Sequence, residues 1–146
     1  MRKFFAVLLV LLVFAIPACA EDAFSKQVQI GRDKAGLTWY LTDYGNGSAP
    51  YAVARKYYTS AAPKTEQIEE LMSRYSVSEK AAKSLYFTES RYEFSDDGTM
   101  YTEVYRKHFD MLGNEILGLV SSRSNRVVKN SIMSKGYAYA VGRLKK

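Results

Sequence analysis

The sequence has very few of the residues that form covalent cross-links and metal centres. Its 146 residues include one cysteine, Cys19, and one histidine, His108. A lone cysteine cannot close a disulfide within the chain, and one histidine supplies too few ligands for a structural zinc site. The sequence also has no glycine-rich phosphate loop and no G-x-S-x-G nucleophile turn. We therefore expect no cofactor, no metal ion and no catalytic set, and a fold that depends on its hydrophobic core.

Acidic residues are missing from the last part of the chain. No aspartate or glutamate follows Glu115, whereas seven basic residues do: Arg123, Arg126, Lys129, Lys135, Arg143, Lys145 and Lys146. A basic segment of this kind can contact an anionic glycan, an envelope polymer or an acidic protein, and the first four of these residues are the candidate contacts. A solvated surface without a partner is the alternative. Nucleic acid is not expected as a partner, because the chain is predicted to be exported.

The only long apolar stretch lies at the start of the chain. Residues 6–16 are all apolar and follow the positive charges of Arg2 and Lys3. This run is shorter than the roughly 20 residues that a helix needs to span a bilayer. Pro17 ends it, because proline lacks a backbone donor and clashes with the preceding turn. The pattern is typical of an export signal.

The residues after this run fit two kinds of processing. Small side chains on both sides of Cys19 match a signal-peptidase site, which predicts a signal peptide over residues 1–20 that is cut after Ala20. Residues 16–19 also resemble a degenerate bacterial lipobox, in which Cys19 would be kept and lipidated. Proline is unusual inside a lipobox and ordinary before a cleavage site, which favours release. We expect a periplasmic, extracellular or cell-surface protein, with membrane contact only if Cys19 carries a lipid.

Residues 21–146 have the length of one domain, and hydrophobic periodicity predicts its elements. Alternation predicts strands near residues 28–30, 37–42, 51–59, 85–94, 99–109 and 115–120. A period of 3.6 predicts a helix from Pro63 to Tyr75, then a short helix capped by Ser76, and a helix at the end. The expected fold class is α+β: an antiparallel sheet of about five strands, as a hairpin and a three-stranded meander, packed by one or two central helices and a short C-terminal helix.

Alternation in the aromatic strands also predicts which side chains share a face of the sheet. Strict alternation places three rings of strand 99–109 on one face: Tyr101, Tyr105 and Phe109. In strand 85–94 it groups five side chains: Tyr86, Thr88, Ser90, Tyr92 and Phe94. Core packing is the favoured role of these rings, and a tyrosine-rich binding surface is the alternative.

The last segment of the chain fits a helix or a strand. Ser134 is a candidate N-cap for a helix that would turn Tyr137, Val141 and Leu144 inward, and this helix is favoured. Two glycines in the segment weaken such a helix by about 1 kcal/mol each relative to alanine. Period-two alternation in residues 137–141 leaves a strand as the other interpretation.

Two arrangements of titratable residues would support an enzyme. His108 and Asp110 lie two positions apart on a predicted strand, as an acid–base pair would. The glutamates Glu89, Glu93 and Glu103 could supply two carboxylates for glycoside hydrolysis. A half-buried histidine and exposed strand glutamates are the plainer interpretations. Because no nucleophile with a defined partner is visible, we expect that the chain is not an enzyme.

Several segments, taken in order, resemble a known family. They are Trp39-Tyr40-Leu41, Tyr92-Glu93-Phe94-Ser95, Asp97 to Tyr101, His108 to Ile116, and the closing residues Ile132, Ser134 and Tyr137 to Val141. This order resembles small secreted bacterial proteins similar to surface-adhesin protein E. Two valines, Val127 and Val128, stand in place of a late tryptophan of that pattern, and its proline before the final helix is absent. The resemblance implies an antiparallel sheet packed by helix, on or near a bacterial surface.

The expected function is a secreted or envelope-associated, non-enzymatic binding or adhesion module of a bacterium. Its expected partners are an anionic glycan, a matrix protein or an envelope polymer. A periplasmic accessory or structural protein is one alternative. A small hydrolase that uses His108 or paired carboxylates is the second. The sequence does not indicate an oligomeric state.

Overall fold

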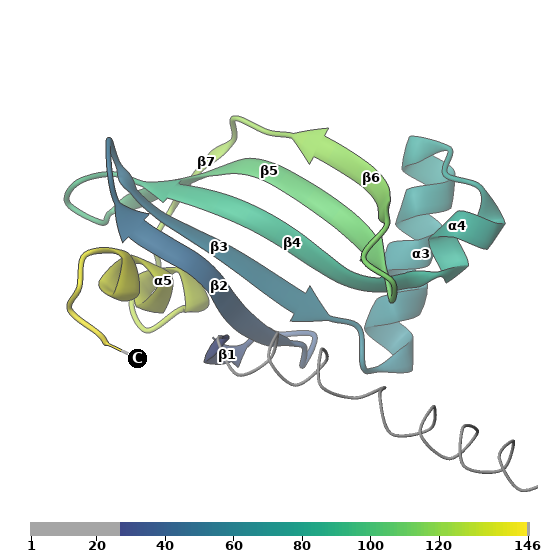
Figure 1. The fold of residues 1–146 in the computed structure, drawn as a ribbon, viewed down its shortest axis with the longest axis horizontal. Coiled ribbons are helices and arrows are strands. Elements are labelled where there is room, and N and C mark those ends of the chain that lie inside the picture. The colour runs from purple at the N-terminus through teal and green to yellow at the C-terminus, as the bar shows by residue number, and fades with distance from the viewer. Residues whose placement is uncertain (1–26, 146) are drawn as a thin grey trace, which may run out of the picture.

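Within residues 27–145, the part of the chain that the computed structural model describes, a seven-stranded antiparallel sheet carries three helices (Figure 1). The predicted signal peptide, its cleavage site at Ala20 and the alternative lipidation site at Cys19 lie outside these residues. The strands are β1 Val28–Arg32, β2 Thr38–Asn46, β3 Pro50–Tyr57, β4 Leu85–Phe94, β5 Met100–Asp110, β6 Glu115–Val120 and β7 Ser124–Arg126. The helices are α3 Ala61–Tyr75, α4 Glu79–Lys83 and α5 Ile132–Ala140.

The strands lie side by side in sequence order from β1 to β6. β6 pairs with the end of β5 and β7 with its start, so these two short strands form one interrupted edge. The predicted α+β class with an antiparallel sheet is confirmed; the predicted hairpin is β2–β3 and the meander is β4–β5–β6. β1 confirms the short strand predicted near residues 28–30 and adds to the five of the hairpin and the meander. β7 was not predicted, because the polar segment 121–130 carries no strand pattern.

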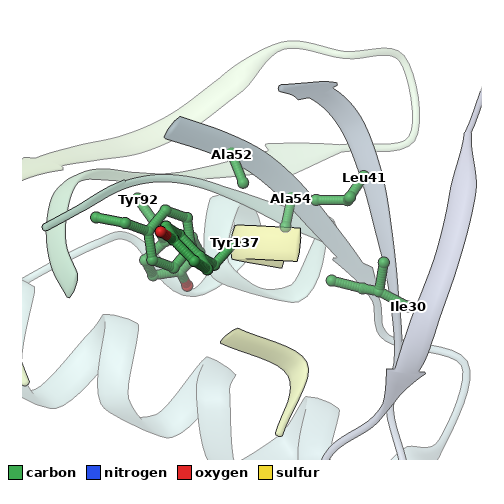
Figure 2. Packing of buried hydrophobic residues seen from close by; sticks show 7 residues of the cluster. Ile30, Leu41, Ala52, Ala54, Tyr92 and Tyr137 are labelled. Carbon is green, nitrogen blue, oxygen red and sulfur yellow. The ribbon is translucent and has the colours of Figure 1, made fainter. Parts of the chain in front are cut away.

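The helices divide the core into two clusters near opposite ends of the sheet (Figure 1). The α5 cluster consists of Ile30, Leu41, Ala52, Ala54, Tyr92, Phe94 and Tyr137, and Figure 2 shows side chains of neighbouring strands gathered around Tyr137. The α3 cluster consists of Leu37, Tyr58, Leu71, Ala82 and Leu85. Strand pairing puts both clusters on one face of the sheet, which we call the helix-side face. The other face is the open face.

A bulge in β5 overturns the predicted alternation of its rings. Tyr92 of β4 pairs with Glu103 and the preceding Arg91 pairs with Tyr105, so Val104 is an extra residue. One extra residue moves the following side chains to the opposite faces. Tyr101 therefore lies on the helix-side face, whereas Tyr105 and Phe109 lie on the open face, and the prediction that the three rings share a face is wrong.

A second irregularity changes the start of β4. The register shifts between Leu85 and Phe87, and the ring of Tyr86 packs against Tyr57 with a centroid distance of 5.7 Å. Tyr86 thus lies on the open face. The other four residues predicted to share its face, Thr88, Ser90, Tyr92 and Phe94, face the helices. Phe87 stacks on Phe109 of β5 at 4.8 Å on the open face.

The predicted central helix forms and buries most of its apolar stripe. Leu71 is fully buried, and Ile68 and Tyr75 pack against the α3 cluster, while Met72 stays 38% exposed. The short helix α4 follows, but its N-cap is Ser78, whose side chain accepts a hydrogen bond from Ala81 N. The predicted cap, Ser76, instead ends α3 in the left-handed conformation, with φ of 55°.

The last segment is a helix, as favoured, and it begins earlier than predicted. The side-chain oxygen of Ser131 accepts from the backbone N–H of Ser134, so Ser131 is the N-cap and Ser134 lies inside the first turn. Tyr137 is buried as expected. Leu144 lies beyond the helix and is 43% exposed, so the prediction that it turns inward is wrong.

Tyr137 also fixes α5 to the β4–β5 hairpin, and this contact gives a stability prediction. Its hydroxyl donates to Asp96 O at 2.6 Å, and its ring covers Gly98 so closely that a Cβ on Gly98 would overlap the ring atoms. Gly98→Ala should therefore lower the free energy of unfolding by about 2–4 kcal/mol, through strain at positive φ and displacement of the ring. Urea unfolding measures the loss.

The matched control is Gly113→Ala. Gly113 also has positive φ, 82° against 71° at Gly98, but nothing lies within 4 Å of a Cβ built there. Only the backbone strain of about 1–2 kcal/mol should remain. Equal losses in the two variants would show that the contact between Tyr137 and the hairpin contributes little.

Candidate binding cleft

Polar side chains occupy the helix-side face between the two core clusters. A sheet face that packs against helices is normally apolar. Here the middle positions of three adjacent strands carry Lys56, Thr88, Ser90, Arg106 and His108, and strand pairing places them next to one another. Rules of burial are most often broken at functional sites, so this polar band is the first candidate for a site.

A cleft of about 640 Å³ lies over part of this band. Ligand sites in proteins usually measure about 300–1,000 Å³. Four strands, β2 to β5, supply its central residues: Trp39, Lys56, Tyr92, Tyr101, Glu103 and Arg106. α3 contributes Glu70, Arg74 and Tyr75, α5 contributes Met133, and the interrupted β6–β7 edge contributes Leu119, Arg123 and Asn125. The cleft thus lies where neither α3 nor α5 covers the sheet.

Two of the four cations in the cleft are held by carboxylates. Arg106 donates to both oxygens of Glu103, from Nε at 3.0 Å and from Nη2 at 2.9 Å. Arg74 donates to Glu70 at 3.3 Å, one helical turn away on α3. Among residues 27–145, Lys56 and Arg123 form no ion pair within 4.0 Å. Four cations and two carboxylates leave the cleft with an excess of positive charge.

The ammonium of Lys56 is surrounded by rings and by other charges. Its Nζ lies 5.4 Å from the ring centroid of Trp39 and 5.7 Å from that of Tyr58. The indole is held in place, because its Nε1–H donates to Asp33 at 3.0 Å. Burial lowers the pKa of Lys56 below its ordinary value, and the positive charge of Arg106 lowers it further.

A chain of hydrogen bonds runs from the cleft wall into the sheet. Gln67 donates to Glu70 at 2.9 Å, and its amide oxygen accepts from the hydroxyl of Tyr58 at 3.2 Å. The Tyr58 hydroxyl has only one hydrogen, so it accepts from Thr88, at 3.0 Å, and Thr88 accepts from Nδ1–H of His108, at 2.8 Å. The chain ties the floor of the cleft to α3 and gives His108 a polar partner.

His108 is buried in the sheet, where it cannot act as an acid or base that is exposed to solvent. Its side chain is 1% exposed. Burial lowers its pKa to about 4, and the positive charges of Arg106 and Lys56 act in the same direction. Asp110 does not pair with it, because its carboxylate accepts from the backbone and side chain of Asn114 in the following turn.

Among the three glutamates considered for hydrolysis, Glu103 lies on one face of the sheet and the other two on the opposite face. Glu103 faces the cleft, where Arg106 holds it. Glu89 and Glu93 pair with residues of β3 that face the open side. Glu89 accepts from Arg55 at 2.7 Å, and Glu93 forms an ion pair with Arg91. The three carboxylates therefore do not flank a common site.

The four basic residues singled out from the sequence are not brought together. Arg123 lies at the cleft, between β6 and β7. Arg126 and Lys129 line a second depression beside the β4–β5 hairpin, and Lys135 lies next to Gly31 at the other edge of α5. Only Arg123 is thus a candidate contact in the cleft.

The sequence contains a pattern that indicates the cleft, although a count of charged residues does not reveal it. Lys56 stands between Ala54 and Tyr58 in the alternation of β3, at a position where an apolar residue is expected. Thr88 and Ser90 interrupt the apolar phase of β4 in the same way. Arg106 could not be found by alternation, because its face depends on the bulge in β5.

The chain matches no protein-family model, no curated protein and no solved structure. Within residues 27–145, no helix is long and apolar enough to cross a membrane, and no three His, Cys, Asp or Glu side chains gather as a metal site would require. The cleft is therefore the observation from which a function is inferred.

The lowered pKa of His108 predicts a pH-dependent stability. An unfolded histidine takes up its proton near pH 6.5, whereas folded His108 does so only near pH 4. Between these values the unfolded chain binds more protons, so stability falls as the pH decreases, by about 3 kcal/mol in total. Urea unfolding of wild type between pH 7 and pH 4 measures this loss.

His108→Gln serves as the comparison, because glutamine retains a polar group and does not titrate. The carboxylates contribute to the acid sensitivity of both proteins, so the difference between the two profiles isolates the histidine. The variant should lose clearly less stability over this pH range. Parallel profiles would contradict the assignment.

Proposed function

We propose that the chain is an exported, non-enzymatic binding module that holds a segment of an anionic glycan or a similar envelope or matrix polymer in the cleft. The observation that carries the proposal is the excess of positive charge in a cleft that is also lined by aromatic rings. Cations give affinity for an acidic polymer, and rings give a surface for the less polar faces of its units.

The geometry of the candidate catalytic residues supports binding rather than turnover. His108 is sealed in the sheet, and the glutamates lie on different faces and in ion pairs. A relationship to the secreted proteins similar to surface-adhesin protein E stays a prediction. It agrees with the proposal in its expected location and in its binding role.

Binding by residues 21–146 tests this proposal. Wild type should bind polygalacturonate or dextran sulfate and not neutral dextran, and its affinity should fall as salt is added. Leu119→Trp would fill the cleft without changing charge and should weaken binding at least tenfold. Val128→Trp is the control, because Val128 is 68% exposed and lies outside the cleft. Isothermal titration calorimetry measures the affinities, and the polymer should keep its length throughout.

The contribution of the remaining basic surface is measured separately. The triple variant Arg126→Gln, Lys129→Gln, Lys135→Gln removes three charges outside the cleft and should change affinity less than threefold at physiological salt. If this variant loses binding and Leu119→Trp retains it, the ligand binds the basic surface and not the cleft. No binding by wild type to any of the acidic polymers would refute the proposed function.

A further inference from the structure

Lys56 is the one cation of the cleft that combines a half-buried position with the lack of an ion pair within residues 27–145. Arg106 and Arg74 are each bonded to a carboxylate. Arg123 is unpaired within residues 27–145 but is exposed at the rim. The ammonium of Lys56 has neither an ion pair nor a side-chain hydrogen bond in that part of the chain, although most of the side chain is withdrawn from solvent. Lys56 borders both the cleft and a smaller depression lined by Asp33, Gln67 and Glu70, so its three N–H donors are open to ligand or solvent there.

An anion in the cleft would supply what this ammonium lacks. A partly buried cation is costly unless it is paired and hydrogen-bonded. The rings of Trp39 and Tyr58 attract it, at 5.4 and 5.7 Å, but do not accept strong hydrogen bonds. An acidic oxygen bound to Nζ would complete the site, and it would reverse the lowering of the pKa of Lys56 that burial and Arg106 produce.

The neighbouring carboxylates limit how much negative charge this place accepts. Three carboxylates act on Lys56 electrostatically, Asp33, Glu103 and Glu70, and the last two line the same cleft. They would repel a doubly charged group such as a phosphate monoester. A group with a single negative charge, a carboxylate or a sulfate ester, fits the local balance best.

Aromatic rings lie beside this place on the sheet. Tyr92 is buried at 5% exposure and lies between Trp39, at 6.3 Å, and Tyr101, at 5.8 Å between centroids; the half-buried rings of Trp39 and Tyr101 are the ones that border the cleft. These rings come from β4, β2 and β5, so the sheet itself fixes their spacing. The C–H faces of a pyranose pack on such rings while its hydroxyls reach polar groups at the sides of the cleft.

We propose that Lys56 is the anchor for one acidic group of the ligand, and that the bound unit is a pyranose bearing a single carboxylate or sulfate ester. This inference rests on the proposed function and narrows it to a substrate class and a specificity-determining residue. Lys56 selects the acidic unit over its neutral counterpart, whereas the rings contribute equally to the binding of both units. Arg106 is a positioning residue, since its guanidinium is already bonded to Glu103 through Nε and Nη2.

The test compares ligands that differ only in charge. Wild-type residues 21–146 are titrated calorimetrically with oligogalacturonate, with its methyl ester and with a sulfated galactan oligosaccharide. Wild type should bind an acidic form at least tenfold more tightly than the ester. The carboxylate and sulfate arms show which acid the site takes. Lys56→Met should bring the acid and the ester within twofold of each other, mainly by weakening the acid.

Two further variants keep the result interpretable. Lys64→Met removes the same charge from α3 outside the cleft and should leave the preference intact. Lys56→Arg retains a cation and should keep part of the preference, which a purely structural role of Lys56 would not predict. Thermal unfolding confirms that each variant is folded.

The outcomes separate the two proposals. If Lys56→Met keeps the wild-type preference while Leu119→Trp loses binding, the cleft is the site but Lys56 is not its anchor. If wild type binds the acid and the ester equally, charge is not selected and the inference is overturned. If wild type binds none of the acidic ligands, the proposed function fails and the inference fails with it.

Discussion

The cleft depends on one extra residue in β5. Val104 has no partner in β4, and this bulge sets the faces of all later residues in the strand. Because of it, Glu103 and Arg106 point to the same side and form two hydrogen bonds, and His108 reaches Thr88. In a regular strand Arg106 and His108 would turn to the open face, and the cleft would lose the positive charge of Arg106.

The cleft also requires that the helices leave the middle of the sheet uncovered. α5 is fixed at one end by Tyr137, which packs in the α5 cluster and donates to Asp96 of the hairpin. α3 is fixed at the other end by Leu71, which is fully buried. Each contact holds a helix over apolar residues, and the polar band lies between them.

A polar band inside a small sheet is stable only if its hydrogen bonds are satisfied. Within residues 27–145, every buried side-chain nitrogen and oxygen has a hydrogen-bond partner. The chain through Gln67, Tyr58 and Thr88 satisfies His108 without an added charge. Lys56 stays outside this network, and its ammonium makes no side-chain hydrogen bond within residues 27–145.

Local periodicity determined most of the secondary structure. Alternation predicts the hairpin and the meander, and the 3.6-residue period predicts α3, because side-chain direction in a regular element follows from its geometry. The caps were less predictable: Ser76 and Ser134 have suitable chemistry, but the observed N-caps are Ser78, two residues later, and Ser131, three residues earlier. β7 carries no pattern of its own and exists because β5 offers an unpaired edge.

By itself the sequence determined the class of the fold, an α+β domain with an antiparallel sheet, and the scarcity of cysteine and histidine that limits its chemistry. It also showed the basic end of the chain but not where those charges lie. Only the tertiary structure separated Arg123 from Arg126 and Lys129, and only it joined Lys56 with Arg106, fifty positions apart. The physical reason is that faces and neighbours in a sheet are set by bulges and pairing between strands, which no single strand encodes.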